Sequence, residues 1–422
     1  MKVEPLKNFT SSGLPASIMT YINANKFVTP TPIQAHCWPV LQAKRDIIGI
    51  AETGSGKTLA FSVPGITRIL DKKGGKGTKQ PSMLVLAPTR ELAIQSAQVI
   101  TKVGKACGVS CTCIYGGVSK HEQRRAVRQG VNCVVATPGR LKDLVQEGSV
   151  DLSGVKFMVL DEADRMLDMG FERDVREIIG MADPNRQTAM FSATWPQEIR
   201  ELASEFLTTP VRVVVGADEL TANVRVEQHI EVIEERARDT RLLALLSKVH
   251  KSRTNRVLVF ALYKKEAERL EQMLSRQGWQ AVAVHGDKSQ ADRERALSEF
   301  KTKKSPLMIA TDVAARGLDI PDVEFVINYS YPLETSGYIH RIGRTGRAGK
   351  KGVSYTFFHQ GDKARAGELI NVLREAGQAV PEALTRFGTH VKKKEHKNYG
   401  AFAKDVDMNV KGKKTTFDSD SD

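Results

Sequence analysis

Cysteine is scarce in this sequence, and its five occurrences follow no metal-binding spacing. No further Cys or His residue completes a zinc pattern around Cys111 and Cys113, which alternate along a predicted strand. We therefore expect reduced thiols of an intracellular protein, which contribute mainly to packing. The five positions are Cys37, Cys107, Cys111, Cys113 and Cys133.

Long apolar runs are also missing. No stretch approaches the length of about 20 apolar residues that a membrane-spanning helix needs. The first residues, MKVEPLKNFTSSGLP, contain no apolar core of the signal-peptide kind. We expect a soluble, intracellular protein without a membrane partner.

Acidic residues are outnumbered by basic ones. The 422 residues include 63 Lys and Arg but only 49 Asp and Glu, which gives a formal charge of +14. Such an excess favours a polyanionic partner, nucleic acid first. A basic protein that is merely soluble remains the alternative on charge alone.

Short apolar runs alternate with longer amphipathic stretches along most of the chain. Runs that are apolar on both faces are typical of parallel strands covered by helices on both sides. One amphipathic stretch, 264–277, places Ala267, Leu270 and Leu274 on one face and ends before Gly278, a helix-terminating residue. The predicted strands are 47–50, 83–87, 133–136, 157–160, 189–193, 211–215, 256–262, 281–286, 307–311, 323–328 and 353–358.

The alternation pauses once, in the polar segment 216–228, and then restarts. This predicts two α/β domains in tandem, each built on a mostly parallel sheet. After about residue 390 the chain becomes rich in Lys and then in acids, which favours disorder. That tail is either a solvated end or a nonspecific RNA-binding or nuclear-targeting arm. The expected divisions are a flank over 1–35, a first domain over 36–216, a linker over 217–226, a second domain over 227–385 and a tail over 386–422.

A phosphate-binding loop is predicted at 51–58, AETGSGKT, between a strand and a helix. Gly54 and Gly56 allow backbone N–H groups to turn toward a phosphate, and Lys57 can reach the β- and γ-phosphates. The Thr58 hydroxyl can hold Mg²⁺. The alternative is a glycine-rich turn before a helix. The expected nucleotide-binding residues here are Ala51, Glu52, Thr53, Gly54, Ser55, Gly56, Lys57 and Thr58.

A cluster of carboxylates follows the apolar run 157–160 directly, in the order Asp161, Glu162 and Asp164. Asp161, at the end of a predicted strand, is placed to meet Mg²⁺ together with Thr58. Glu162 can then orient and deprotonate an attacking water. An exposed acidic turn is the alternative, and it fits poorly with four apolar residues leading in.

Motifs along nearly the whole chain resemble those of the DEAD-box RNA helicases. The resemblance is carried by DEAD (161–164), TPTPIQ (29–34) after Phe27, APTRELA (87–93), GG (116–117), TPGR (137–140), SAT (192–194), VLVF (257–260), QADR (290–293), ATDVAARGLDI (310–320) and HRIGRTGR (340–347). It implies two RecA-like domains joined by a short linker, with ATP and Mg²⁺ as cofactors and RNA as partner. Lys26 departs from the family pattern, which usually has Gly there.

The resemblance also implies roles for single residues. Gln34 would pair with adenine and Phe27 would stack on it, although a helix-start turn with a core Phe is the alternative. The second domain would supply Arg344 and Arg347 as arginine fingers, Asp319 for the ribose and His340 to order water. Ser192 and Thr194 would bond Asp164, which makes that acid structural.

RNA contacts are expected on both domains, at loop–helix starts suited to backbone phosphates. No aromatic cluster offers base stacking, so binding should be independent of sequence. The candidates are Thr89, Arg90, Gly117, Thr137, Arg140, Gln290, Arg293, Thr311, Arg316 and Gly317.

The expected activity is that of a monomeric RNA-dependent ATPase that unwinds short duplexes or remodels ribonucleoprotein. An ATP-locked RNA clamp with slow hydrolysis is an alternative, and the Q motif and SAT count against a DNA translocase. FSATWP (191–196) and FGTHVKKKEHK (387–397) resemble the subgroup of the yeast nucleolar helicase of large-subunit ribosome assembly and its plant relatives. This implies a nucleolar protein on pre-ribosomal particles, with the cytoplasm as the alternative location.

Overall fold

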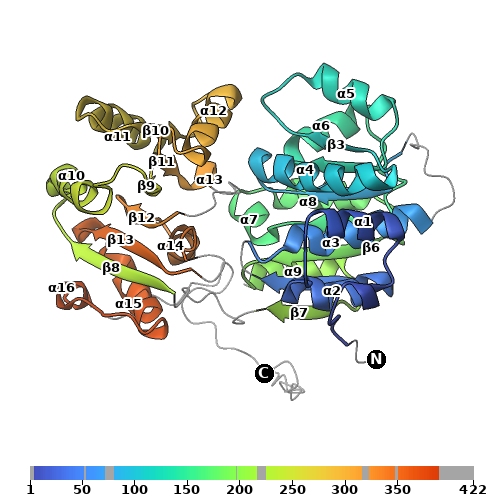
Figure 1. The fold of residues 1–422 in the computed structure, drawn as a ribbon, viewed down its shortest axis with the longest axis horizontal. Helices are drawn as coiled ribbons and strands as arrows, with labels where there is room; N and C mark the ends of the chain where they lie inside the picture. Colours follow the sequence, from blue (N-terminus) through green and yellow to red (C-terminus); the bar gives the residue numbers. More distant parts are fainter. Residues whose placement is uncertain are drawn as a thin grey trace, which may run out of the picture.

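The computed structural model describes residues 4–51, 54–71, 80–195, 197–215, 225–315, 323–346 and 350–388. Two separate sheets, each with helices packed around it, lie side by side (Figure 1). This confirms the predicted pair of α/β domains. Within the described ranges, no helix combines the length and apolarity needed to cross a bilayer. All five cysteines are free thiols, and Cys37 and Cys133 are buried.

The first domain has seven parallel strands in the order β3-β4-β2-β5-β6-β1-β7. Alternate residues of β1 enter the two hydrophobic cores on opposite faces of the sheet, because side chains alternate along a strand. The strands are β1 Ile47–Ala51, β2 Met83–Leu86, β3 Cys111–Ile114, β4 Cys133–Ala136, β5 Phe157–Leu160, β6 Gln187–Ser192 and β7 Val211–Val215. The helices are α1 Ala16–Ala24, α2 Pro32–Gln42, α3 Lys57–Asp71, α4 Arg90–Cys107, α5 Lys120–Arg128, α6 Pro138–Gln146, α7 Ala163–Asp168, α8 Glu172–Met181 and α9 Gln197–Phe206.

The second domain has six parallel strands in the order β10-β11-β9-β12-β13-β8. The strands are β8 Val226–Val232, β9 Val257–Ala261, β10 Ala281–Val284, β11 Leu307–Thr311, β12 Phe325–Asn328 and β13 Gly352–Phe358. The helices are α10 Arg238–Val249, α11 Lys264–Arg276, α12 Gln290–Lys301, α13 Asp312–Ala315, α14 Thr335–Ile342, α15 Ala366–Glu375 and α16 Glu382–Thr385.

Helix α11 confirms the amphipathic prediction for 264–277. Ala267, Leu270 and Leu274 are fully buried, and Gly278 follows the helix with a left-handed φ of 74°. Such a backbone favours glycine and ends the helix.

Strand β8 was not among the predicted strands. It lies at the sheet edge and pairs only with β13 in the described part of the chain. Val226, Gln228 and Ile230 are buried, whereas Glu227 between them is exposed. A search for continuous apolar runs misses such a strand, because Glu227, Gln228 and His229 interrupt its apolar residues. Val226, the last residue of the expected linker, begins this strand; 216–224 and most of the expected tail lie outside the described residues.

The turn after α1 explains the unusual Lys26. Lys26 has a φ of 55°, and the following Phe27 donates its N–H to the carbonyl of Ile22 at 3.2 Å. This hydrogen bond closes a Schellman motif, in which the residue with positive φ is usually Gly. The motif fixes where Phe27 leaves the helix, and the Phe27 ring contacts Tyr21 with 6.4 Å between ring centroids.

Replacing Lys26 with Gly is expected to raise the free energy of unfolding by up to about 1 kcal/mol, because Gly adopts a left-handed backbone without strain. Denaturant titration measures this change. The neighbouring Asn25, with a φ of −89°, is the control. Asn25→Gly should instead destabilise the protein, and a loss of stability in Lys26→Gly would contradict the prediction.

Candidate functional site

Three carboxylates are buried at the carboxyl end of β5, in the middle of the first sheet. Asp161, Glu162 and Asp164 are 2%, 5% and 5% exposed. Glu162 has a left-handed backbone with a φ of 54°, which is costly for a residue with a side chain. Strain of this kind clusters at functional sites, where the surrounding structure holds it in place.

Of the two adjacent carboxylates, Asp161 has a raised pKa and Glu162 has a lowered one. Burial, and then the charge of Glu162, raise the pKa of Asp161 to about 7. Burial also raises the pKa of Glu162, but the attraction of Arg165 and Lys57 outweighs it, so that this pKa lies below its usual value. Arg165 Nη1 donates to Glu162 Oε2 at 2.8 Å inside the protein. Glu162 is therefore held as a carboxylate at neutral pH.

Asp161→Asn is expected to stabilise the nucleotide-free protein at pH 8, because it removes a buried like charge. A shift of the Asp161 pKa from 3.8 to about 7 corresponds to as much as about 4 kcal/mol. A raised carboxyl pKa contributes stability below pH 3.8 that is lost as the pH rises through about 7. The gain from the substitution should therefore shrink between pH 7 and pH 4.

Denaturant titration at pH 8 and at pH 5 measures this effect. Asp143 has a side chain that is 51% exposed, and Asp143→Asn is the control. The control should change stability by less than about 0.5 kcal/mol at either pH. Destabilisation by Asp161→Asn at pH 8 would contradict the prediction.

Two glycines with positive φ precede α3 in the segment predicted to bind phosphate. Gly54 and Gly56 have φ values of 83° and 95°. Lys57 begins α3, is 7% exposed, and its Nζ donates to the carbonyl oxygen of Ala51 at 2.6 Å. The lysine head thus lies inside the loop, and Thr58 follows on the first turn of the helix. Glu52 and Thr53 lie outside the described residues.

The amide of Gln34 joins the Q motif to this loop. Gln34 is 4% exposed; its Oε1 accepts the N–H of Thr31 at 3.0 Å, and its Nε2 donates to the carbonyl of Gly56 at 3.1 Å. A Cβ at position 56 would lie 2.7 Å from Gln34 Nε2, so only Gly fits there. A primary amide has two N–H groups and two lone pairs, which leaves one of each for a base. Phe27, 40% exposed, lies close in sequence.

The second domain reaches this site through α14 and the residues after it. Helices α13 and α14 lie on the side of their domain that faces the first domain and α7 (Figure 1). His340 and Arg344 lie near enough to Glu162 to lower its pKa further. Arg344 is 4% exposed. The second domain therefore brings positive charge toward the carboxylates of the first. Arg347 and Asp319 lie outside the described residues.

Arg341 has a different environment from Arg344, although both belong to HRIGRTGR. Its side chain is 1% exposed, and Nε and Nη2 bond the two carboxylate oxygens of Asp312 at 2.7 Å each. Nη1 donates to the carbonyl of Ser330 at 2.6 Å. Arg341 thus holds α14 against its own domain.

Asp164 connects the acidic cluster to SAT. Its Oδ2 accepts hydrogen bonds from the N–H and the Oγ1 of Thr194 at 3.0 and 2.9 Å, and from the N–H of Ala193 at 3.2 Å. Ser192, fully buried, accepts a longer bond from the Thr194 N–H at 3.4 Å. Of the two expected partners, Thr194 therefore bonds Asp164 directly, and Ser192 supports Thr194.

The expected RNA-contact residues of the first domain follow the carboxyl ends of β2, β3 and β4. Thr89 and Thr137 are the N-caps of α4 and α6. The guanidinium of Arg90 packs against Gly117, where a Cβ would lie 2.3 Å from Arg90 Nη1. Arg140 Nη1 donates to the carbonyl of Val118 at 3.0 Å, which ties the TPGR helix to the same loop.

On the second domain, Gln290 begins α12 and Thr311 ends β11. Arg293 lies against the other domain, with 2.6 Å between its Nη2 and Oε1 of Glu91. Both side chains of this interdomain ion pair are about nine-tenths buried. The pair therefore joins the two domains directly. Arg316 and Gly317 lie outside the described residues.

Sequence reasoning missed two charged residues of the site. Arg165 stands one helical turn after Glu162, and this i,i+3 spacing could have identified it as a partner. Glu91 had no such local signal, because Arg293 is its partner from the other domain.

Comparisons with known proteins agree with this geometry. Residues 31–202 match the family described as DEAD/DEAH box helicase, and residues 237–349 match the helicase conserved C-terminal domain. The DEAD-box ATP-dependent RNA helicase 5 of Oryza sativa is 57% identical over all of this chain and 83% of its own length. The ATP-dependent RNA helicase DBP3 of Saccharomyces cerevisiae is 52% identical over 99% of this chain and 80% of its own length.

Among solved structures, Dbp5 of S. cerevisiae bound to RNA and ADP BeF3 is similar with a TM-score of 0.78 and 29% identity. The match covers 89% of this chain and 95% of that one. The fold is therefore that of two tandem RecA-like domains. Because relatives matched over at least four-fifths of their own length are more than 50% identical and both domain families match, this chain belongs to the DEAD-box ATP-dependent RNA helicases.

Proposed function

We propose that this protein is an RNA-stimulated ATPase that locally unwinds short RNA duplexes or remodels ribonucleoprotein. The observation that carries this proposal is the composite site, in which Arg344 and His340 of one domain act on Glu162 of the other. If the site is complete only when the domains are closed, any ligand that stabilises the closed state also promotes hydrolysis. RNA bound across both domains would stabilise that state.

ATP would bind to the loop and to the Q motif. The backbone N–H groups from Gly54 to Gly56 and the α3 N-terminus favour phosphate. Lys57 would exchange the Ala51 carbonyl for a phosphate oxygen. Gln34 would use its remaining N–H and lone pair on adenine, and the exposed face of Phe27 would stack on the base. We assign supporting loop contacts to Glu52, Thr53 and Ser55, and ribose contact to Asp319.

The donor set also fits Mg²⁺. Within the described ranges, no cluster of three or more His, Cys, Asp or Glu residues could cage a metal ion. Mg²⁺ instead needs only one or two protein oxygens together with the phosphates. Thr58 and Asp161 would hold it, and a bound cation would offset the repulsion between Asp161 and Glu162, which together with burial raises the pKa of Asp161 to about 7. When bound, the ion would offset the phosphate charge.

Hydrolysis would depend on three residues around the phosphate. Glu162, a carboxylate at neutral pH, would orient and deprotonate the attacking water. Arg344, with Arg347, would stabilise the charge on the transferred phosphoryl group. His340 would help to order the water. Asp164 would act through Thr194, which ties the carboxylate end of β5 to the SAT loop.

RNA would run over the loop–helix starts of both domains. On the first domain Thr89, Arg90, Gly117, Thr137 and Arg140 would contact backbone phosphates, which gives binding without sequence preference. The second domain would supply Gln290, Arg293, Thr311, Arg316 and Gly317. Arg293, which also pairs with Glu91, would make RNA contact and domain closure part of one event.

The test compares ATP turnover with single-stranded RNA, with DNA of the same sequence and without nucleic acid. We expect stimulation by RNA alone, together with release of a short duplex under excess ATP. Equal stimulation by DNA would overturn the RNA assignment. Slow turnover without duplex release would identify an ATP-locked clamp instead.

We further propose that this activity serves ribosome assembly in the nucleolus, on pre-ribosomal particles, and that the chain acts as a monomer. The likeness of FSATWP and FGTHVKKKEHK to the nucleolar subgroup supports this, as does the Lys-rich tail. Crosslinking of the tagged protein to RNA, with imaging of its location, is the test. A cytoplasmic protein without pre-ribosomal crosslinks would rule the assignment out.

A further inference from the structure

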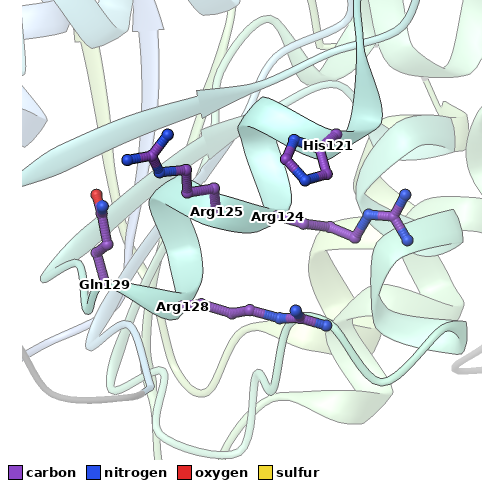
Figure 2. A pocket seen from close by; sticks show the side chains of 5 residues that line it. All are labelled: His121, Arg124, Arg125, Arg128 and Gln129. Carbon is purple, nitrogen blue, oxygen red and sulfur yellow. The ribbon is translucent and has the colours of Figure 1, made fainter.

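Helix α5 carries a basic surface that the proposed nucleotide and RNA sites do not use. Counting about 100° per residue, four of its side chains and Gln129 fall within one arc of about 140° on the helix surface. Together they line a hollow of about 370 Å³ (Figure 2). We call this surface the α5 basic face: His121, Arg124, Arg125, Arg128 and Gln129.

The charges on this face are poorly neutralised. Arg124 Nη1 lies 3.7 Å from an oxygen of Glu147, which Lys120 Nζ approaches more closely at 2.6 Å. Arg125 and Arg128 are exposed, and no carboxylate of the described residues forms an ion pair with either. Figure 2 shows the arginine side chains extending away from the helix.

Arginines on other surface helices are arranged differently. On α8, Arg173 pairs with Glu177 and Arg176 pairs with Glu172, each one helical turn away. Such pairs add a few tenths of a kcal/mol to a helix, whereas like charges at this spacing cost similar amounts. The α5 basic face thus has a small cost for folding, which is consistent with a surface kept for an anionic partner.

The position of α5 indicates which anionic partner this face binds. Its N-cap, Ser119, lies two residues after Gly117, and buried Gln123 donates to the carbonyl of Tyr115 at 2.9 Å. Arg140, an expected RNA contact, bonds Val118 in the same loop. The N-terminal end of α5 is therefore anchored in the loop that carries the proposed RNA path on the first domain.

We propose that the α5 basic face binds the phosphate backbone of RNA that extends beyond the stretch held between the two domains. This inference rests on the proposed function. It assigns to Arg125 and Arg128 an electrostatic contact that is independent of RNA sequence, because arginine forks suit phosphate oxygens. Long RNA would then bind more tightly than a short strand that only fills the core path.

The experiment compares the full-length protein with Arg125→Ala/Arg128→Ala. Fluorescence anisotropy measures binding to oligouridine of about 8 and about 25 nucleotides, with ADP and beryllium fluoride present. For the long strand we expect a 5- to 20-fold loss of affinity, and a slope of log affinity against log salt that is smaller by about 1.4. Affinity for the short strand, and the ATP turnover it stimulates, should not change.

The control variant is Lys102→Ala/Lys105→Ala, which removes two exposed charges from the far end of α4 in the same domain. It should behave like the wild type. The α5 variant should remain folded, because Ala favours helix and relieves repulsion. Melting curves check this.

Equal affinity and an equal salt slope for long RNA would overturn the proposal, and so would an equal loss for both strands. Displacement of long RNA by polyglutamate as effectively as by unlabelled RNA would identify a general polyanion surface, which also overturns it. If the wild type bound neither strand, the proposed function itself would fail, so the two failures are distinguishable.

Discussion

Arg344→Ala is expected to lower RNA-stimulated ATP turnover by about 10³- to 10⁵-fold, the range seen when an arginine finger is removed. The physical reason is that Arg344 brings a fixed positive charge from the second domain to the region of Glu162. Charge that develops on the phosphoryl group would then be left without its counter-charge. Single-turnover hydrolysis with saturating RNA measures the effect.

Arg374 provides a control for Arg344. It lies in the last turn of α15 in the same domain and is exposed, so Arg374→Ala removes the same charge away from the site. That variant should hydrolyse ATP like the wild type. ATP binding without RNA should survive in Arg344→Ala, because the loop and the Q motif lie in the first domain. Normal turnover in Arg344→Ala would contradict the composite site.

Glu162→Gln is expected to reduce turnover by about 10²- to 10⁴-fold, which is the usual contribution of a general base. An amide has a similar shape but cannot take a proton from water. ATP and RNA should still bind, and the trapped complex should release RNA slowly. Steady-state hydrolysis and RNA dissociation rates measure both effects.

Stability must be followed in the same variant, because Glu162 pairs with buried Arg165. The Gln oxygen can still accept from Arg165, but a buried charge loses its counter-ion, which is destabilising. Melting curves separate this loss from the loss of chemistry. Glu172→Gln, at an exposed carboxylate of α8, is the matched control. Unchanged turnover in Glu162→Gln would remove the role of base from this residue.

The local parts of the site were predictable from the chain because each depends on neighbours in sequence. Gly54, Gly56 and Lys57 predict a phosphate loop, and the structure places them between β1 and α3 as that prediction requires. Asp161 and Glu162 after four apolar residues define acids at a strand end. Most strands were found because parallel strands are apolar on both faces, and β8 was missed because polar residues interrupt its apolar ones.

The residues that join distant segments could not be read in this way. Arg341 and Arg344 are the same residue type in one motif, yet one is bound to Asp312 within its domain and the other acts on Glu162 across the domains. Arg341 lies within α14 and Arg344 lies in the turn after it, and the motif alone does not show where the helix ends. The residue types and their spacing therefore established the chemistry, whereas the folded chain determined which charges meet, because burial and long-range packing set the electrostatics of each group.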